Sequence, residues 1–210
     1  MCGEWEFGGR LALIFANYHR HSYRGCKPAI TDIIMGATAL VAEYNGVRNA
    51  PHIRDSITDL MIIAELAYAS GIAASVRAHP TSSGIYEPDF LYSNTGRYLS
   101  GVNVYHEFDI LTSIAGGLPS TLPFEQEWLN DETGPYLEKY IMRKPEISAE
   151  KQHRLFRFIS DYTTSAMTGW SQSAGVHGGG SPVMEKIGIR TLYDLESKRN
   201  IVKYLAGISD

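Results

Sequence analysis

Apolar residues recur at every third or fourth position along most of the chain, a pattern typical of amphipathic helices. Leu11, Ile14, Phe15 and Tyr18 share one face of the first such segment. The pattern predicts helices over residues 9–23, 29–44, 51–78, 105–115, 149–174, 183–193 and 195–208, with one or two further turns at 134–142. No stretch alternates as a strand does, and no segment repeats. The sequence therefore predicts an all-α fold, a helical bundle.

Glycine, proline and capping residues separate these segments. Pro28 suits the first turn of the second helix, and Ser148 is a good N-cap for the helix over 149–174. Residues 81–101, "TSSGIYEPDFLYSNTGRYLSG", are predicted to form a long polar connection. A connection of this length is uncommon in a compact domain and is often functional. Its aromatic residues would either line a cofactor or substrate cavity or pack beneath a crossover.

Composition places the chain among ordinary globular domains. Its 210 residues are 44% hydrophobic and 20% charged, which suits one domain with a full core. The formal net charge of −4 argues against nucleic acid as the main partner. No membrane span is expected, because Asp59 and Glu65 interrupt the most apolar run. With no signal peptide visible and only Cys2 and Cys26 as cysteines, a reduced, cytoplasmic setting is expected. The abrupt entry into a helical pattern suggests that Met1 is an internal methionine of a longer protein or the start of a split gene.

The stretch "YHRHSYRGCKPA" concentrates reactive side chains. His19, Tyr23 and Cys26 stand at i, i+4 and i+7, which would place them on one narrow stripe of the helix predicted there. An imidazole and a thiolate so placed can both reach a metal or an iron–sulfur cluster, and Lys27 would lower the pKa of the thiol. Two ligands alone do not make a metal site. The alternative is that Tyr23 and Cys26 are core or helix-end residues and that His19 only caps the helix or forms a hydrogen bond.

The segment "HGGGSP" is predicted to be a glycine-rich turn between two helices. Gly178, Gly179 and Gly180 would allow a phosphate or a planar ring to approach the backbone, and the following helix N-terminus favours an anion. The alternative is a simple helix-breaking turn. Glu185, just beyond the turn, is a candidate catalytic carboxylate, although an exposed glutamate in a first helical turn is the more ordinary expectation.

Four segments together resemble a known family: "MCGEWEFGG", "FANYHRHSYRGCKPA", "SGIYEPDFLYSNTGRYLSG" and "HGGGSP". They are similar to the C-terminal helical part of the 4-hydroxybutyryl-CoA dehydratase/vinylacetyl-CoA isomerases. Those enzymes belong with the flavin-dependent 4-hydroxyphenylacetate 3-hydroxylases, and their fold is similar to that of acyl-CoA dehydrogenases. The resemblance runs over most of the chain, and its most specific element is H-x3-Y-x2-C-K.

The resemblance implies roles for particular residues. His19 and Cys26 would be ligands of a [4Fe–4S] cluster, with His19 also able to accept a proton. Tyr23 and Lys27 match active-site positions of the same motif. Glu185 is the nearest candidate for an active-site glutamate of the family. The glycine-rich segment, residues His177, Gly178, Gly179, Gly180 and Ser181, would help to hold FAD, in relatives often that of a neighbouring subunit.

The chemistry that the resemblance implies is a radical dehydration of a 4-hydroxyacyl-CoA thioester to crotonyl-CoA, with isomerisation of vinylacetyl-CoA. FAD would supply a one-electron path that makes an otherwise non-acidic β-hydrogen acidic, and the cluster would act as a Lewis acid on the leaving hydroxyl. The family's chains are more than twice as long and carry two further cluster cysteines in their N-terminal part.

The chain therefore resembles only a C-terminal helical-bundle domain, residues 1–210, without the N-terminal helical and central β-barrel domains. By itself it is expected to be inactive and to need the missing half, as a separate subunit or as sequence beyond this chain. In the complete enzyme we expect a homo-oligomer, a homotetramer by analogy, that acts on an acyl-CoA.

Two alternatives remain at this point. The chain could be a component of a flavin-dependent 4-hydroxyphenylacetate 3-monooxygenase-like enzyme, in which Cys26 would have no ligand role. It could also be a catalytically inert helical interaction domain that keeps only the fold.

Overall fold

The computed structural model describes residues 3–19 and 21–208, and Met1 and Cys2 lie outside these ranges. The predicted all-α fold is confirmed. In chain order the elements are α1 (Trp5–Tyr18), α2 (Tyr23–Tyr44), α3 (Pro51–Val76), β1 (His79–Pro80), β2 (Tyr86–Glu87), α4 (Phe90–Val102), α5 (Val104–Ala115), the 3-10 helix η1 (Leu118–Thr121), α6 (Glu125–Trp128), α7 (Gly134–Ile141), α8 (Ala149–Thr164), α9 (Ala166–Gly179), α10 (Pro182–Leu192) and α11 (Leu195–Ala206).

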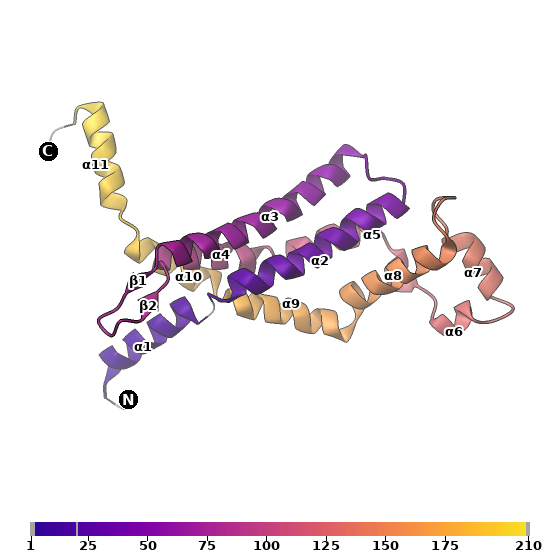
Figure 1. Cartoon of the computed structure of the whole chain (residues 1–210), viewed down its shortest axis with the longest axis horizontal. Coiled ribbons are helices and arrows are strands. Elements are labelled where there is room, and N and C mark those ends of the chain that lie inside the picture. Colours follow the sequence, from indigo (N-terminus) through magenta and orange to yellow (C-terminus); the bar gives the residue numbers. More distant parts are fainter. Residues whose placement is uncertain (1–2, 20, 209–210) are drawn as a thin grey trace.

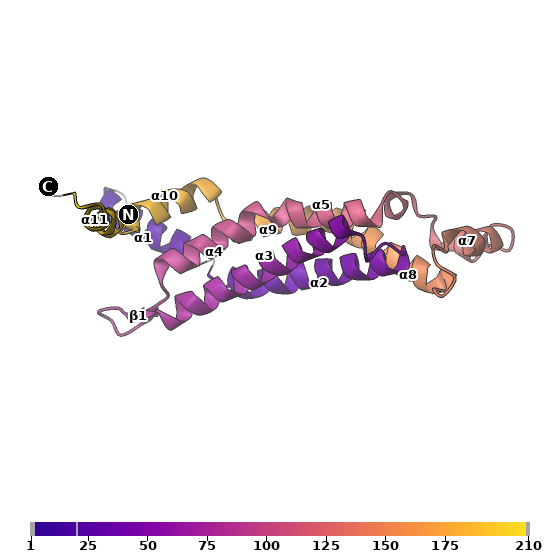
Figure 2. The ribbon, with the colours of Figure 1, turned by 90° about the horizontal axis from the view of Figure 1, so that it is seen from above.

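The molecule is elongated along α2 and α3 (Figure 1). These two long helices pack against each other, α4 packs on α3, and α9 and α10 pack on α4. The short hairpin of β1 and β2, α1, α10 and α11 lie at one end, and α6 and α7 lie at the opposite end (Figures 1 and 2). Segments far apart in the sequence therefore meet around α4.

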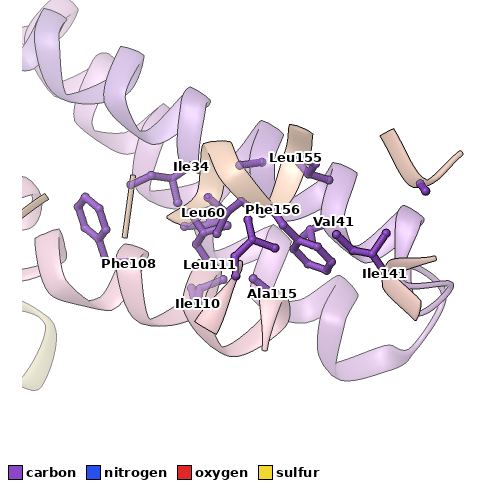
Figure 3. Close-up of a cluster of buried hydrophobic side chains, with 14 residues drawn as sticks. Ile34, Val41, Leu60, Phe108, Ile110, Leu111, Ala115, Ile141, Leu155 and Phe156 are labelled. Atoms are coloured by element: carbon purple, nitrogen blue, oxygen red, sulfur yellow. The ribbon is translucent and has the colours of Figure 1, made fainter. Parts of the chain in front are cut away.

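The main hydrophobic core joins α2, α3, α5 and α8 (Figure 3). Ile34, Leu60, Leu111 and Ile159 are completely buried in it. Burying each such side chain stabilises the fold by about 1.5–3 kcal/mol. The core begins on α2 at Ile34, so the first turns of α2 extend beyond it toward the end of the molecule that holds α1 and α10.

The boundary between the first two helices differs from the prediction. A helix was expected over 9–23, and His19, Tyr23 and Cys26 were expected on one helical stripe, but α1 ends at Tyr18 and α2 begins at Tyr23. Pro28 lies inside α2 and does not begin it. Pro28 is the sixth residue of α2, so it removes the backbone hydrogen bond to the carbonyl oxygen of Arg24, and burial of Tyr23 and Lys27 in the same turns offsets that cost.

The connection predicted over residues 81–101 is mostly helix. Asp89 accepts a hydrogen bond from the backbone N–H of Tyr92 (3.0 Å) and so caps α4. The Ser, Asn and Gly residues of α4 are poor helix formers, which is why the pattern missed the helix. Burial of Ser93, Asn94, Gly96 and Ser100 against neighbouring helices outweighs that propensity.

The helix predicted over 149–174 is divided. Ser148 is the N-cap, as predicted, and accepts from the backbone N–H of Lys151 (3.4 Å). At Ser165 the backbone is extended, and its hydroxyl caps α9 by accepting from Thr168 N–H (3.4 Å). A second N-cap within the apolar pattern thus ends α8 and starts α9.

The expectation that no segment is apolar enough for a membrane is too strict. By length and composition alone, the stretches Trp5–Tyr44 and Pro51–Val76 could cross a membrane. Core helices pass the same test, so the finding is weak evidence. α3 packs against α2 and α4 within the bundle.

Candidate active site

The four candidates of the H-x3-Y-x2-C-K motif are divided between two helices. His19 follows the last residue of α1 and stacks on Phe15, with ring centroids 4.4 Å apart. Tyr23, Cys26 and Lys27 lie in the first turns of α2. The predicted single stripe is therefore wrong for His19, because the helix is interrupted between it and Tyr23.

Exposure separates the same four residues into two pairs. His19 and Cys26 are exposed, and Cys26 is a free thiol. Tyr23 and Lys27 are buried. Among residues 3–19 and 21–208, no group of three or more His, Cys, Asp and Glu side chains could hold a metal ion. The assignment of His19 and Cys26 as cluster ligands stays a prediction.

The glycine-rich segment packs directly on Tyr23. A Cβ at Gly178 would lie 2.8 Å from two ring carbons of Tyr23, and one at Gly175 would lie 3.2 Å from its hydroxyl oxygen. A Cβ at Gly179 would lie 2.7 Å from the Cα of Gly101. Close packing of α9 on α2 and α4 thus explains why Gly178 and Gly179 carry no side chain.

The remainder of that segment forms the predicted turn between helices. Gly180 ends α9 with a φ of 97°, a conformation that favours glycine, and Ser181 caps α10 by accepting from Met184 N–H (3.4 Å). His177 is exposed on the last turn of α9. The assignment of this segment to FAD stays a prediction. Its inward faces at Gly178 and Gly179 are already covered, so a flavin would meet His177, Gly180 or Ser181.

Glu185 is buried and not exposed, contrary to the ordinary expectation for a first-turn glutamate. Its Oε1 accepts a hydrogen bond from Arg97 Nη2 at 2.8 Å, and both side chains are almost fully buried. Arg97 Nε also donates to the carbonyl oxygen of Gly179 (3.1 Å), and its Nη1 donates to the carbonyl oxygens of Ala16 and Asn17. Arg97 therefore connects α4 to α1, α9 and α10.

A second arginine, Arg24, is buried beside this pair. Its side chain passes close to Gly71 of α3 and Gly96 of α4, where a Cβ would lie 2.7 Å from it in each case. Its Nη1 donates to Ser100 Oγ at 3.4 Å. Burial first, and then the guanidinium of Arg97, lowers the pKa of Arg24 to about 9. Glu185 opposes this shift.

Lys27 forms the second buried ion pair of the site. Its Nζ donates to Glu107 Oε2 and to Thr31 Oγ1 (2.9 Å), and Thr31 Oγ1 also donates to Glu107 Oε2 (3.0 Å). Burial lowers the pKa of Lys27 and raises the pKa of Glu107, and their mutual contact opposes both shifts. Burial, and next Glu107, raises the pKa of Tyr23 well above its ordinary value. Tyr23 therefore remains a neutral phenol at neutral pH.

A cavity of about 130 Å³ adjoins the Arg97–Glu185 pair between α1, α4 and α10. Phe90 and Asn94 contribute to its wall, so part of residues 81–101 does line a cavity, while Ser93, Gly96 and Ser100 are buried in the bundle. Most of the other lining side chains are apolar, including Leu13, Met184 and Ile187.

Comparison with known proteins decides the family. A family model described as 4-hydroxyphenylacetate 3-hydroxylase C terminal matches residues 9–207. The chain belongs to the 4-hydroxyphenylacetate 3-hydroxylase family. It is 32% identical over 216 residues to 4-hydroxybutyryl-CoA dehydratase/vinylacetyl-CoA-Delta-isomerase of Clostridium aminobutyricum, a match that spans 99% of this chain and 44% of that protein.

Solved structures agree with this assignment. An oxygen-tolerant archaeal 4-hydroxybutyryl-CoA dehydratase from N. maritimus superposes with a TM-score of 0.87 at 34% identity, covering 99% of this chain and 41% of the other. The oxygenase component of 4-hydroxyphenylacetate 3-monooxygenase, complexed with FAD and 4-hydroxyphenylacetate, shares the fold at 24% identity, with a TM-score of 0.81 over 90% of this chain and 39% of the other. The chain thus spans less than half the length of these relatives.

Arg24, Arg97 and Glu107 were not among the sequence candidates for this 4-hydroxyphenylacetate 3-hydroxylase family chain. Their contacts join residues 76 to 88 positions apart, which no local spacing reveals. The available signal was the placement of Arg97 within residues 81–101, which the sequence already connected with a cavity.

Proposed function

We propose that the chain is the C-terminal part of a 4-hydroxybutyryl-CoA dehydratase that also isomerises vinylacetyl-CoA. The observation that carries the proposal is the exposed thiol of Cys26, which lies one helical turn beyond the buried Tyr23 and next to the buried Lys27. A surface thiolate is suited to ligate a metal, and a monooxygenase has no need of one there. The similarity to two 4-hydroxybutyryl-CoA dehydratases over 99% of the chain supports it.

His19 and Cys26 would supply two ligands of a [4Fe–4S] cluster, and the remaining ligands would come from the N-terminal half of the longer protein. When bound, the cluster would supply a Lewis acid for the substrate hydroxyl, and FAD would supply one-electron chemistry. FAD would lie against His177, Gly180 and Ser181. The packing against Gly178 and Gly179 would hold that segment in place.

The residues of this chain would bind and orient the substrate and move its protons. Tyr23 is a neutral buried phenol, so it can donate a hydrogen bond to a substrate oxygen. Lys27 is held by Glu107 and Thr31, so it would act through its positive charge and its position. Glu185 would accept a proton most readily once its ion pair with Arg97 loosens, because that pair stabilises the carboxylate.

The proposed enzyme needs partners. Large apolar side chains are exposed on several helices, among them Phe15, Leu66, Ile72 and Leu205. Contiguous exposed apolar surface is typical of interfaces. We therefore propose that the N-terminal half and further copies of the chain cover these surfaces, in a cytoplasmic homotetramer acting on an acyl-CoA, and that this chain alone is inactive.

A second candidate is a flavin-dependent monooxygenase component. Oxygenase components of Rhodococcus opacus 4-nitrophenol 4-monooxygenase/4-nitrocatechol 2-monooxygenase and Thermus thermophilus 4-hydroxyphenylacetate 3-monooxygenase are each 27% identical, over 62% and 71% of this chain. In that case Cys26 would have no ligand role. An inert interaction domain would bind neither cofactor.

The test is to co-express the chain with the N-terminal half under anaerobic conditions and to measure iron, acid-labile sulfide, flavin and turnover of 4-hydroxybutyryl-CoA. The dehydratase proposal predicts bound iron and sulfide that Cys26→Ala and His19→Ala reduce. Cys2→Ala and His52→Ala, which change the same residue types elsewhere, should leave iron and turnover unchanged.

The co-expression experiment gives a different result for each candidate function. A pair that holds no iron and is unaffected by Cys26→Ala contradicts the dehydratase proposal. If that pair consumes oxygen with reduced flavin and 4-hydroxyphenylacetate, the monooxygenase candidate replaces it. A pair that binds neither iron nor flavin supports the inert domain.

A further inference from the structure

A groove of about 380 Å³ lies on α10 beside α4, at the start of α11. We call it the α4–α10 groove. Its cations are Lys186 and Arg190, its aromatic rings are Tyr98 and Tyr193, and its apolar wall includes Ile189. The volume lies within the range of roughly 300–1,000 Å³ that is common for small-molecule sites. The groove is separate from the cavity beside Arg97 and Glu185, because the two share no lining residue.

The charge of the α4–α10 groove is unbalanced. Lys186 and Arg190 stand at i and i+4 on α10, so they point to the same side, and none of the Asp and Glu residues that the structure describes lines the groove. Neither cation forms an ion pair with any residue in 3–19 or 21–208. Two positive charges therefore converge in a chain whose formal net charge is −4.

The acids nearest in sequence already have partners. Glu185 is bound to Arg97. Asp194 accepts from the backbone N–H of Ser197 (3.0 Å) and caps α11, and Glu196 pairs with Arg199. The groove cations thus remain available to an external anion.

Aromatic surface accompanies the charge. Lys186 Nζ lies 5.0 Å from the centroid of the Tyr98 ring, and Tyr193, which follows the last residue of α10, is 46% exposed. Tyrosine rings can stack on a planar heterocycle, and Arg and Lys can bind phosphate oxygens. A simple carboxylate would use the charges and leave the exposed ring of Tyr193 without a partner.

We propose that the α4–α10 groove binds the adenosine diphosphate group of a nucleotide, with its phosphates on Lys186 and Arg190 and its base against Tyr98 or Tyr193. Free ADP, CoA and FAD all carry this group, and CoA has an additional 3′-phosphate. CoA and FAD are also the substrate carrier and the cofactor of the proposed dehydratase, so with either of them as the ligand the inference deepens that proposal, while its test measures binding to this chain without any turnover.

The test is calorimetric titration of the chain with ADP, and then with CoA, dephospho-CoA and FAD. We expect saturable binding of one ADP per chain, weakened by added salt, with adenosine and inorganic phosphate each binding far more weakly. Lys186→Gln and Arg190→Gln should each weaken ADP binding roughly tenfold, because each removes a charge-assisted contact. Tyr98→Leu should also weaken it, whereas Lys151→Gln on α8 should not. Thermal melts establish that each variant is folded.

Comparison of the ligands shows which molecule supplies the bound adenosine diphosphate group. Tighter binding of CoA than of dephospho-CoA identifies CoA, and equal binding of FAD and ADP identifies a flavin or a free nucleotide. The proposal is overturned if the chain binds no ADP at millimolar concentration, or if the Lys186→Gln/Arg190→Gln double variant binds ADP as the unchanged chain does. If the co-expressed enzyme still holds iron and turns over its substrate, such a result rejects nucleotide binding in the α4–α10 groove and does not contradict the dehydratase proposal.

Discussion

Arg97 and Glu185 lie 88 residues apart in the sequence and form an ion pair of 2.8 Å that water hardly reaches. The same guanidinium donates to the carbonyl oxygen of Gly179 and to two carbonyl oxygens at the end of α1. One side chain therefore fixes three segments that carry His19, the glycine-rich turn and Glu185. The candidate site depends on this arginine as much as on its own reactive groups.

Removing this guanidinium should destabilise the fold strongly. Arg97→Met removes the guanidinium that donates to the buried Glu185 carboxylate, so the free energy of unfolding should fall by about 3–5 kcal/mol in urea denaturation. Arg199→Met is the matched control, because its pair with Glu196 is exposed. An exposed pair contributes only about 0–1 kcal/mol. Equal losses in the two variants would contradict a structural role for Arg97.

The glycines of α9 should differ sharply in their tolerance of a methyl group. Gly178→Ala places a Cβ 2.8 Å from the Tyr23 ring, so we expect a loss of about 1–3 kcal/mol in the free energy of unfolding. Gly169 lies in the same helix, and a Cβ there meets nothing within 4 Å. Gly169→Ala should therefore stabilise α9 by about 0.5–1 kcal/mol. Equal effects in thermal or urea denaturation would show that Tyr23 does not pack as described.

The sequence predicted some helices of the bundle and missed others. Periodicity found the long helices, because their apolar faces must be buried whatever the partner. It missed α4, whose small polar residues are poor helix formers in isolation and are stabilised by burial against other helices. It left open whether three consecutive glycines mark a ligand site or a simple turn, and Gly178 and Gly179 pack against neighbours that only the fold brings near.

The residues of the candidate site were also predicted only in part. The H-x3-Y-x2-C-K spacing located a real concentration of buried and reactive groups, but the stripe argument failed because the helix breaks between His19 and Tyr23. The sequence could not predict the roles of Glu107 and Arg97, because a partner 80 or more positions away leaves no local pattern. Long-range charge pairing is decided by helix packing, and no spacing rule describes that.

The Lys27–Glu107 pair should show strong coupling in a double-mutant cycle. Lys27→Met or Glu107→Leu alone leaves one charge buried without its partner, so each should cost about 3–5 kcal/mol in the free energy of unfolding. The double variant leaves no charge and should cost much less than the sum of the two. Additive losses in urea denaturation would mean that the two groups do not act as a pair.

Tyr23 should make the stability of the fold depend on pH in the alkaline range. Burial and Glu107 raise its pKa above the ordinary value of 10.0, so the folded chain keeps this proton at pH values where the unfolded chain has lost it. The folded state then binds more protons, and the free energy of unfolding falls as pH rises above 10. The contribution is fully present below pH 10, and the loss from this one group is limited to about 1.4 kcal/mol per pH unit.

Tyr23→Phe removes the titrating hydroxyl and keeps the ring that packs on Gly178. In urea denaturation between pH 8 and 11, the difference in unfolding free energy between the unchanged chain and Tyr23→Phe should be constant up to about pH 9 and should shift in favour of the variant above pH 10. Tyr204→Phe changes a hydroxyl on a ring that is 85% exposed, so its curve should run parallel to that of the unchanged chain. A constant difference for Tyr23→Phe across the whole range would mean that the Tyr23 hydroxyl ionises as easily in the folded state as in the unfolded one, which would contradict its burial beside Glu107.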